Sequence, residues 1–281
     1  MFRLFQYLTL QVEPTAACNL DCKICMRRNL GRPNTSLSLD NFKKILDSGN
    51  FRYVGLHGWG EPLLNQQLFE MIEYAETSGV GTNLTTNGTL VRENMNGIFG
   101  SGLREIAFGV YDKDLLSQCS PQIDELIREK KRRRSKRPKT YLDITIYQEN
   151  LGQILDLVEL APELQIDAVI LHRLFNVYKV DAAIKYILDE EEDELFAEIR
   201  RLAKTLKLEV YIPPKHSYPC RIVKRSIFVT AEGEVTPCCF LPEFHLDNAL
   251  ESRVREIMHS KAYADFVKNM KTHPICSRCQ W

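Results

Sequence analysis

Strand-length apolar runs alternate with stretches of helical periodicity six times along the first 210 residues. The apolar runs are residues 8–14, 53–60, 81–88, 105–110, 141–147 and 168–175. Such alternation predicts parallel strands joined by helical crossovers. We therefore expect an α/β fold over residues 1–210. Its functional groups should gather at the C-terminal ends of the strands, where the connecting loops meet, whether the sheet closes or stays open.

The pattern changes near residue 211, which indicates a second, smaller module over residues 211–281. Residues 211–220 contain three prolines and break the alternation. Residues 226–239 predict two short strands that turn at Glu232 and Gly233. Residues 251–270 predict one helix, and the sequence CSRC follows at residues 276–279.

Composition narrows the classes of partner. The 281 residues include 37 Lys and Arg against 37 Asp and Glu, so whole-protein charge gives no argument for nucleic acid or a membrane. No run reaches about 18 uninterrupted apolar residues, the length of a membrane span. The first residues lack a basic segment followed by an apolar one, as a signal peptide would have. We expect a cytoplasmic protein.

Three cysteines, Cys18, Cys22 and Cys25, directly follow the first predicted strand in the sequence ACNLDCKIC. Clustered cysteines in a reducing compartment favour metal ligation over disulfides. Structural zinc uses four ligands, usually in pairs. A 4Fe-4S cluster held by three thiolates instead leaves one iron open for a substrate or cofactor, which explains the missing fourth cysteine.

The C-x3-C-x2-C pattern in the loop after the first strand resembles the signature of the radical S-adenosylmethionine (SAM) superfamily. The resemblance implies a partial (β/α)6 barrel of the TIM type, and a 4Fe-4S cluster whose free iron binds SAM. It also implies cleavage of SAM to a 5'-deoxyadenosyl radical that removes a hydrogen atom from substrate. An external one-electron donor such as flavodoxin or ferredoxin would be a partner. Relatives often carry an aromatic residue where this chain has Ile24.

A second match follows the second predicted strand. The sequence GWGEP, residues 58–62, resembles the Gly-Gly-Glu-Pro stretch of the family, with Trp59 in place of one glycine. In the family, backbone carbonyls of this stretch contact the amino group of SAM. The resemblance therefore assigns Gly58, Gly60 and Glu61 to cofactor binding.

Further candidates lie at later strand ends. Asn87 resembles a third-strand residue that faces SAM or substrate, although a simple Asn-Gly turn explains it as well. Tyr111 and Asp112 lie where relatives carry a polar residue that contacts the ribose of SAM, with solvated loop residues as the alternative. Arg173, our catalytic candidate, can hold an anionic substrate group or form a structural salt bridge. We expect neighbouring His172 to be a satisfied core or interface histidine rather than a proton carrier.

Five cysteines belong to the C-terminal module, while isolated Cys119 is expected to be a small core residue. Their order resembles the truncated SPASM, or Twitch, extension of the superfamily, which implies an auxiliary 4Fe-4S cluster. The Gly233 to Cys238 spacing matches its G-x4-C element and favours Cys238 over Cys239. A four-thiolate zinc site is the alternative. The implied ligands are Cys220, Cys238, Cys276 and Cys279.

The predicted function is oxidation by a radical SAM enzyme. A closed auxiliary cluster can accept the electron that a substrate radical loses, which completes a two-electron oxidation. The cysteine arrangement resembles that of the aminocyclitol dehydrogenase of the butirosin pathway, so a sugar or cyclitol is the first substrate class. One alternative is a peptide or cofactor maturase. The other is an iron-sulfur carrier or a zinc-stabilised binding protein that makes no radical.

Two charge runs have simpler explanations. The basic run at residues 130–139 can contact phosphate, but we expect a solvated helix end, and nucleic acid is not a predicted partner. The acidic run at residues 189–194 is expected to open a helix, where negative charge favours the N-terminal dipole.

Overall fold

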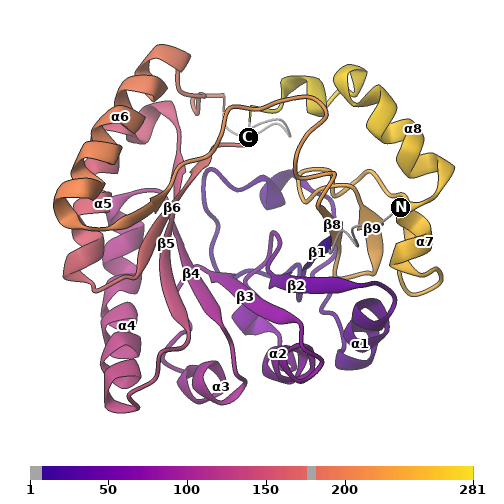
Figure 1. Ribbon diagram of the computed structural model, residues 1–281, viewed down its shortest axis with the longest axis horizontal. Helices are drawn as coiled ribbons and strands as arrows, with labels where there is room; N and C mark the ends of the chain where they lie inside the picture. Colours follow the sequence, from indigo (N-terminus) through magenta and orange to yellow (C-terminus); the bar gives the residue numbers. More distant parts are fainter. Residues whose placement is uncertain (1–7, 176–181, 281) are drawn as a thin grey trace, which may run out of the picture.

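The computed structural model describes residues 8–175 and 182–280, which form one curved ten-stranded sheet with helices on its outer side (Figure 1). The strand order is β10-β9-β8-β1-β2-β3-β4-β5-β6-β7, and all neighbours from β8 to β7 pair in parallel. The first seven strands are β1 (Leu8–Val12), β2 (Phe51–Leu56), β3 (Gly81–Thr86), β4 (Glu105–Val110), β5 (Lys139–Ile146), β6 (Ala168–Arg173) and β7 (Glu209–Tyr211).

Six helices follow β1 to β6 in turn and cover the convex face of the sheet (Figure 1). They are α1 (Leu39–Asp47), α2 (Leu68–Thr77), α3 (Met95–Gly100), α4 (Lys113–Arg132), α5 (Leu151–Glu163) and α6 (Asp189–Leu206). Within the described ranges no ladder joins β7 to β10, so the sheet stays open. The predicted partial (β/α)6 barrel is confirmed, and the structure adds the short strand β7 to it.

The two faces of the strands differ in chemistry. Alternate residues point to opposite faces, and one set packs under the helices in the main core, including Leu10, Leu56 and Ile144. The other set faces the inside of the barrel and includes Gly55 and Asp143, which are small or polar. The interior of the barrel is therefore suited to polar ligands.

The C-terminal segment joins the same sheet. Strands β8 (Ser226–Val229) and β9 (Glu234–Thr236) form the predicted hairpin, and Gly233 at its turn has a φ of +87°. The sequence did not predict that β8 would pair in parallel with β1, from Thr9 opposite Ser226 to Val12 opposite Val229. The third strand, β10 (Asp247–Asn248), pairs antiparallel with β9.

One predicted helix is two helices. Residues 251–270 form α7 (Val254–Met258) and α8 (Lys261–Asn269) instead of one continuous helix. The break occurs because Ser260 leaves the helical conformation and its hydroxyl accepts a hydrogen bond from the Tyr263 N–H, which caps α8. Both helices lie beside β8 and β9 (Figure 1).

The two charge runs behave as expected. Helix α6 begins at Asp189, within the acidic run. In the basic run Lys130 pairs with Asp167, Arg132 pairs with Glu129 and Lys139 pairs with Glu209. Part of the basic run is therefore paired with carboxylates of the same chain. None of the helices in the described ranges is long and apolar enough to span a membrane.

Candidate functional site

The three N-terminal cysteines share one loop between β1 and the short 3-10 helix Met26–Asn29. The Cys25 N–H donates to the Cys22 carbonyl at 3.0 Å, and the Leu20 N–H donates to the Cys18 Sγ at 3.4 Å. Burial, together with the charges of Cys22 and Cys18, raises the pKa of Cys25 to about 11. The three thiols therefore lie close enough to repel one another as thiolates, an arrangement that a cationic iron cluster would stabilise.

The GWGEP loop is in direct contact with the cysteine loop. A Cβ atom at Gly60 would lie 2.0 Å from the Thr15 carbonyl oxygen and 2.6 Å from that of Ala17. The Glu61 N–H donates to the same Ala17 carbonyl at 2.8 Å. Only glycine permits this close approach of two backbones.

The same loop also packs against the end of β1. A Cβ atom at Gly58 would lie 2.6 Å from the Glu13 Cγ, and the Trp59 N–H donates to the Glu13 carboxylate at 2.9 Å. Among the described residues, the carbonyls of Gly58 and Gly60 accept no hydrogen bond. Two acceptors therefore remain available for a donor such as an ammonium group.

The Glu61 side chain connects the loop after β2 to the end of β3. Its buried carboxylate accepts from the Thr86 hydroxyl at 2.8 Å, the Asn87 N–H at 2.8 Å and the Leu63 N–H at 3.0 Å. Burial raises the pKa of this carboxyl, and the three hydrogen bonds oppose that rise only in part. Because these hydrogen bonds occupy the carboxylate, its role is structural, and any cofactor contact of Glu61 would come from its backbone.

Asn87 forms the turn that was the alternative explanation, and it also reaches the cysteine loop. Its amide oxygen accepts from the Thr89 N–H at 3.0 Å, and Gly88 follows with a φ of +78°. Its Nδ2 donates to the Asn19 side chain at 2.9 Å and lies 4.0 Å from the Cys18 Sγ. Asn87 therefore connects the end of β3 to the cysteine loop.

Tyr111 and Asp112 have separate roles. The Tyr111 hydroxyl forms a hydrogen bond with the Cys22 thiol, and burial followed by the Cys22 charge raises the pKa of Tyr111. The Lys23 Nζ lies 5.9 Å from the Tyr111 ring centroid. The Asp112 carboxylate accepts from the Leu115 N–H at 2.8 Å and caps α4. Tyr111 thus belongs to the cysteine site, whereas the Asp112 side chain is engaged in the helix cap.

Arg173 forms the structural salt bridge that was the alternative to a catalytic role. Its guanidinium pairs with both oxygens of Glu192, the second at 2.8 Å, and donates to the Pro214 carbonyl at 2.7 Å. The Arg173 residue is only 6% exposed. The sequence could not show this pairing because Glu192 lies on the following helix, in a run of acidic residues with no positional signal.

A polar cluster inside the barrel was missed by sequence reasoning. The His172 Nδ1 lies 3.0 Å from the Asp143 carboxylate, and the Gln11 Nε2 lies 3.2 Å from the His57 Nδ1. Burial lowers the pKa of His57 to about 4, while Asp143 raises the pKa of His172 against the effect of burial. The available signal was that polar residues occupy the inward positions of four different strands or strand ends.

Three of the C-terminal cysteines, Cys220, Cys238 and Cys276, pack against one small apolar cluster. Burial raises the pKa of Cys276 to about 12, followed by the charges of Cys238 and Cys220. Burial, followed by the charges of Cys276 and Cys279, raises the pKa of Tyr218, whose hydroxyl donates to the Cys276 carbonyl. The four predicted ligands therefore share one neighbourhood. In the described part of the chain, no three His, Cys, Asp or Glu side chains are arranged to hold a single metal ion.

Two contacts connect the loops that follow the barrel strands to the C-terminal hairpin. The Trp59 indole N–H donates to the Cys239 carbonyl at 2.8 Å. Arg32 pairs with Glu13 and also with Glu232 at the hairpin turn, the latter at 2.6 Å. The GWGEP loop and the C-terminal cysteines are thus in contact.

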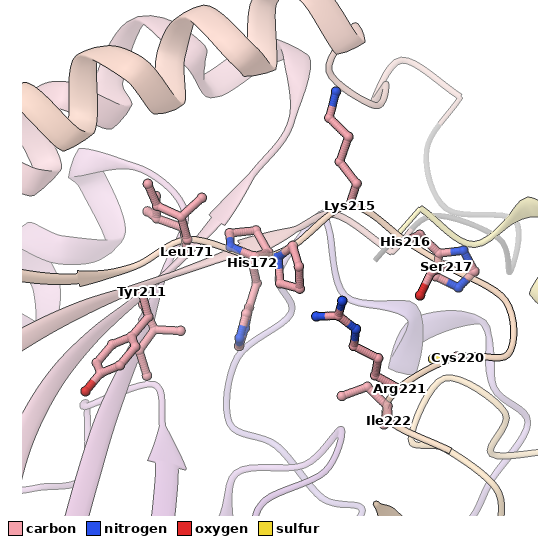
Figure 2. A pocket seen from close by; sticks show the side chains of 13 residues that line it. Leu171, His172, Tyr211, Lys215, His216, Ser217, Cys220, Arg221 and Ile222 are labelled. Carbon is pink, nitrogen blue, oxygen red and sulfur yellow. The ribbon is translucent and has the colours of Figure 1, made fainter. Parts of the chain in front are cut away.

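A pocket of about 240 Å³ lies between the end of β6 and the segment 211–222 (Figure 2). His172 of the polar cluster and the predicted ligand Cys220 both line it. The pocket therefore lies between the barrel and the C-terminal module.

Two family models match the chain. The radical SAM superfamily model matches residues 12–181, and the SPASM iron-sulfur cluster-binding domain model matches residues 220–280. The chain is also 22% identical to the "Tungsten-containing aldehyde ferredoxin oxidoreductase cofactor-modifying protein" of Pyrococcus furiosus, over 96% of this chain and 86% of that protein.

Two solved structures share the fold. Streptococcus suis SuiB bound to S-adenosylmethionine gives a TM-score of 0.78 at 17% identity, over 97% of this chain and 70% of SuiB. BtrN in complex with AdoMet and 2-DOIA gives 0.56 at 16% identity, over 99% of this chain and 94% of BtrN. The superfamily model covers more than half of the sequence and includes all three N-terminal cysteines. The chain therefore belongs to the radical SAM superfamily and carries a SPASM domain, which implies a SAM-binding 4Fe-4S cluster and an auxiliary iron-sulfur cluster.

Proposed function

We propose that this radical SAM enzyme oxidises the radical that it forms on its substrate, with both cluster sites taking part. The observation that carries the proposal is the close backbone contact between the GWGEP loop and the cysteine loop, in which the Gly58 and Gly60 carbonyls accept no hydrogen bond from any described residue. When bound, the cofactors supply a 5'-deoxyadenosyl radical that removes a hydrogen atom, and an acceptor for the second electron.

The residues of the barrel hold the first cofactor. Cys18, Cys22 and Cys25 would ligate three irons, while the carbonyls of Gly58 and Gly60 accept hydrogen bonds from the amino group of SAM. The Tyr111 hydroxyl, hydrogen-bonded to Cys22, would stabilise that thiolate and modulate the potential of the cluster.

The C-terminal cysteines would hold the auxiliary cluster. Cys220, Cys238, Cys276 and Cys279 share a neighbourhood without converging on one metal position. In a 4Fe-4S cluster each thiolate binds a different iron, which suits this spread better than one tetrahedral zinc. The contact between Trp59 and Cys239 supports electron transfer from the barrel to this cluster, because it brings the two sites together.

The comparisons favour a peptide or cofactor precursor as substrate. The Pyrococcus relative, which this chain matches over nearly its full length, is named a cofactor-modifying protein. SuiB has also been solved bound to the precursor peptide SuiA, with a TM-score of 0.77 to this chain. Oxidation of a small hydroxylated molecule, a sugar or a cyclitol, is the second candidate, and the likeness to BtrN supports it.

The cluster assignments are tested by metal analysis of anaerobically reconstituted protein. Two 4Fe-4S clusters predict about eight irons, falling to about four when Cys18, Cys22 and Cys25 are all changed to Ala. The wild type should form 5'-deoxyadenosine only with a reductant, and the triple variant should form none. About four irons with one zinc would contradict the auxiliary cluster, and absence of SAM cleavage would contradict the enzyme itself.

The substrate class is tested by isotope transfer. Peptide, cofactor-precursor and sugar-containing fractions from deuterium-grown cells of the source organism are offered separately to the enzyme. We expect deuterium in 5'-deoxyadenosine with the peptide or cofactor-precursor fraction. Transfer only from the sugar-containing fraction would favour the second candidate.

A further inference from the structure

The 240 Å³ pocket lies where the sheet fails to close. Its walls come from the end of β6, from Tyr211 at the end of β7, and from the segment that leads to Cys220. Apolar side chains dominate these walls, including Ile170, Ile212, Pro213 and Ile222. Ligand pockets usually enclose about 300–1,000 Å³, so this one is suited to part of a ligand rather than a whole one.

Four of the side chains that line the pocket are basic: His172, Lys215, His216 and Arg221. None of its thirteen lining residues is Asp or Glu. Lys215 is paired with Asp193 at 2.9 Å, and its side chain points away from the others (Figure 2). Burial, followed by the charge of Arg173, lowers the pKa of His216, which favours a neutral ring at pH 7.

Arg221 is the exception among these basic groups. Its guanidinium extends toward the space beside His172 (Figure 2). Among the described residues it has no hydrogen bond and no ion pair. An arginine is always charged and offers a planar fork that binds carboxylate or phosphate through two hydrogen bonds. An unpaired fork at the mouth of an apolar pocket is a ready site for an anion.

We propose that this pocket binds an anionic group, a carboxylate or a phosphate, carried on an apolar part of the substrate, with Arg221 as its partner. The inference rests on the proposed function, because it makes the pocket part of the substrate site. Its position beside His172 and Cys220 would hold the substrate between the barrel interior and the auxiliary cluster. Arg221 is thus a specificity residue that orients the substrate.

The experiment uses three probes with the same phenylethyl body: 3-phenylpropanoate, 2-phenylethyl phosphate and the neutral 3-phenylpropanamide. Binding to the reconstituted holoenzyme with SAM is measured by anaerobic calorimetry. We expect at least one anionic probe to bind about tenfold or more tightly than the amide, as a charge-assisted hydrogen bond would provide. The anion that benefits identifies the group as carboxylate or phosphate.

Arg221→Gln should reduce the affinity for the favoured anion to that for the amide, while Arg221→Lys should retain part of the preference. Lys215→Gln is the matched control, because it also removes a positive charge from the pocket, but one that is already paired with Asp193. Its anion affinity should be unchanged. Equal binding of all three probes, no binding of any, or unchanged affinities in Arg221→Gln would overturn the proposal.

Reductant-dependent SAM cleavage is measured on the same preparations without any substrate. If anion binding depends on Arg221 but the protein never cleaves SAM, the anion site stands and the proposed function fails. If SAM is cleaved normally but no anion preference exists, the pocket proposal alone fails.

Discussion

The two cysteine sites of this chain are built by opposite means. The N-terminal set occupies residues 18–25, and neighbouring backbone holds it, such as the Gly60 contact with Thr15. The C-terminal set runs from Cys220 to Cys279, and three of its members, Cys220, Cys238 and Cys276, pack against the apolar cluster around Phe266. A motif made of backbone contacts is readable in a short stretch of sequence, whereas a site made by packing depends on the whole module.

The first prediction removes the packing that gathers the C-terminal set. Phe266, which is 5% exposed in the cluster with Val223, Leu241 and Met270, is changed to Ala. A cavity of this kind costs about 3–5 kcal/mol. We expect the auxiliary iron to be lost while SAM cleavage persists, as shown by iron content and 5'-deoxyadenosine formation.

Leu188→Ala is the control for this variant, because that side chain is 65% exposed and its truncation should change neither readout. Loss of SAM cleavage together with the auxiliary iron would show that the two sites are one cooperative unit, contrary to the comparison.

The second prediction targets the backbone contact of the N-terminal site. Gly60→Ala forces the GWGEP loop away from the carbonyls of Thr15 and Ala17. A displacement of about 1 Å can cost a hundredfold in rate, so we expect SAM cleavage to fall by about a hundredfold or more. The auxiliary iron should remain. Gly152→Ala is the matched control, since a Cβ there meets nothing within 4 Å, and an unchanged rate in Gly60→Ala would refute the contact.

The third prediction separates the two regions by pH. The pKa of His57 is lowered to about 4 by burial, partly opposed by Asp143. The unfolded chain, with an ordinary pKa near 6.5, binds a proton that the folded barrel does not, so stability falls as the pH drops from about 6.5 to 4, by about 2 kcal/mol.

Hydrogen exchange measured across this pH range should show the loss of stability in β1, β2 and β5. In His57→Gln, the stability of these strands should depend less on pH. The C-terminal module should respond less. An unchanged pH slope in His57→Gln would show that another group titrates instead.

The smallest expected effect concerns the contact between the regions. Trp59→Phe keeps the aromatic contact with Phe240, at 5.9 Å between ring centroids, but removes the hydrogen bond to the Cys239 carbonyl. The free energy of unfolding should fall by about 1 kcal/mol in denaturant titrations. If stability does not change, the two regions are more independent than the structure indicates.

The contrast between local and distant contacts also explains what could be predicted from the sequence. The six strand and helix units and the hairpin at Gly233 were predicted, because periodicity and turn residues are local signals. The three N-terminal cysteines were predicted for the same reason, although their role as ligands stays a prediction. The ion pair of Arg173 with Glu192 and the approach of His172 to Asp143 were not predicted. Both depend on which strands and helices become neighbours, and single residues carry no signal for that.

The β8–β1 ladder has a consequence for any attempt to exchange modules between relatives. β8 is hydrogen-bonded in parallel to β1, the strand that precedes Cys18. The C-terminal module is therefore part of the barrel sheet and is not a separate domain joined only by a linker. A graft would have to restore the pairing of Thr9 with Ser226, since a slip of one residue would reverse the faces of β8 and rotate the hairpin that carries Cys238. Register, rather than linker length, would decide whether a chimera works.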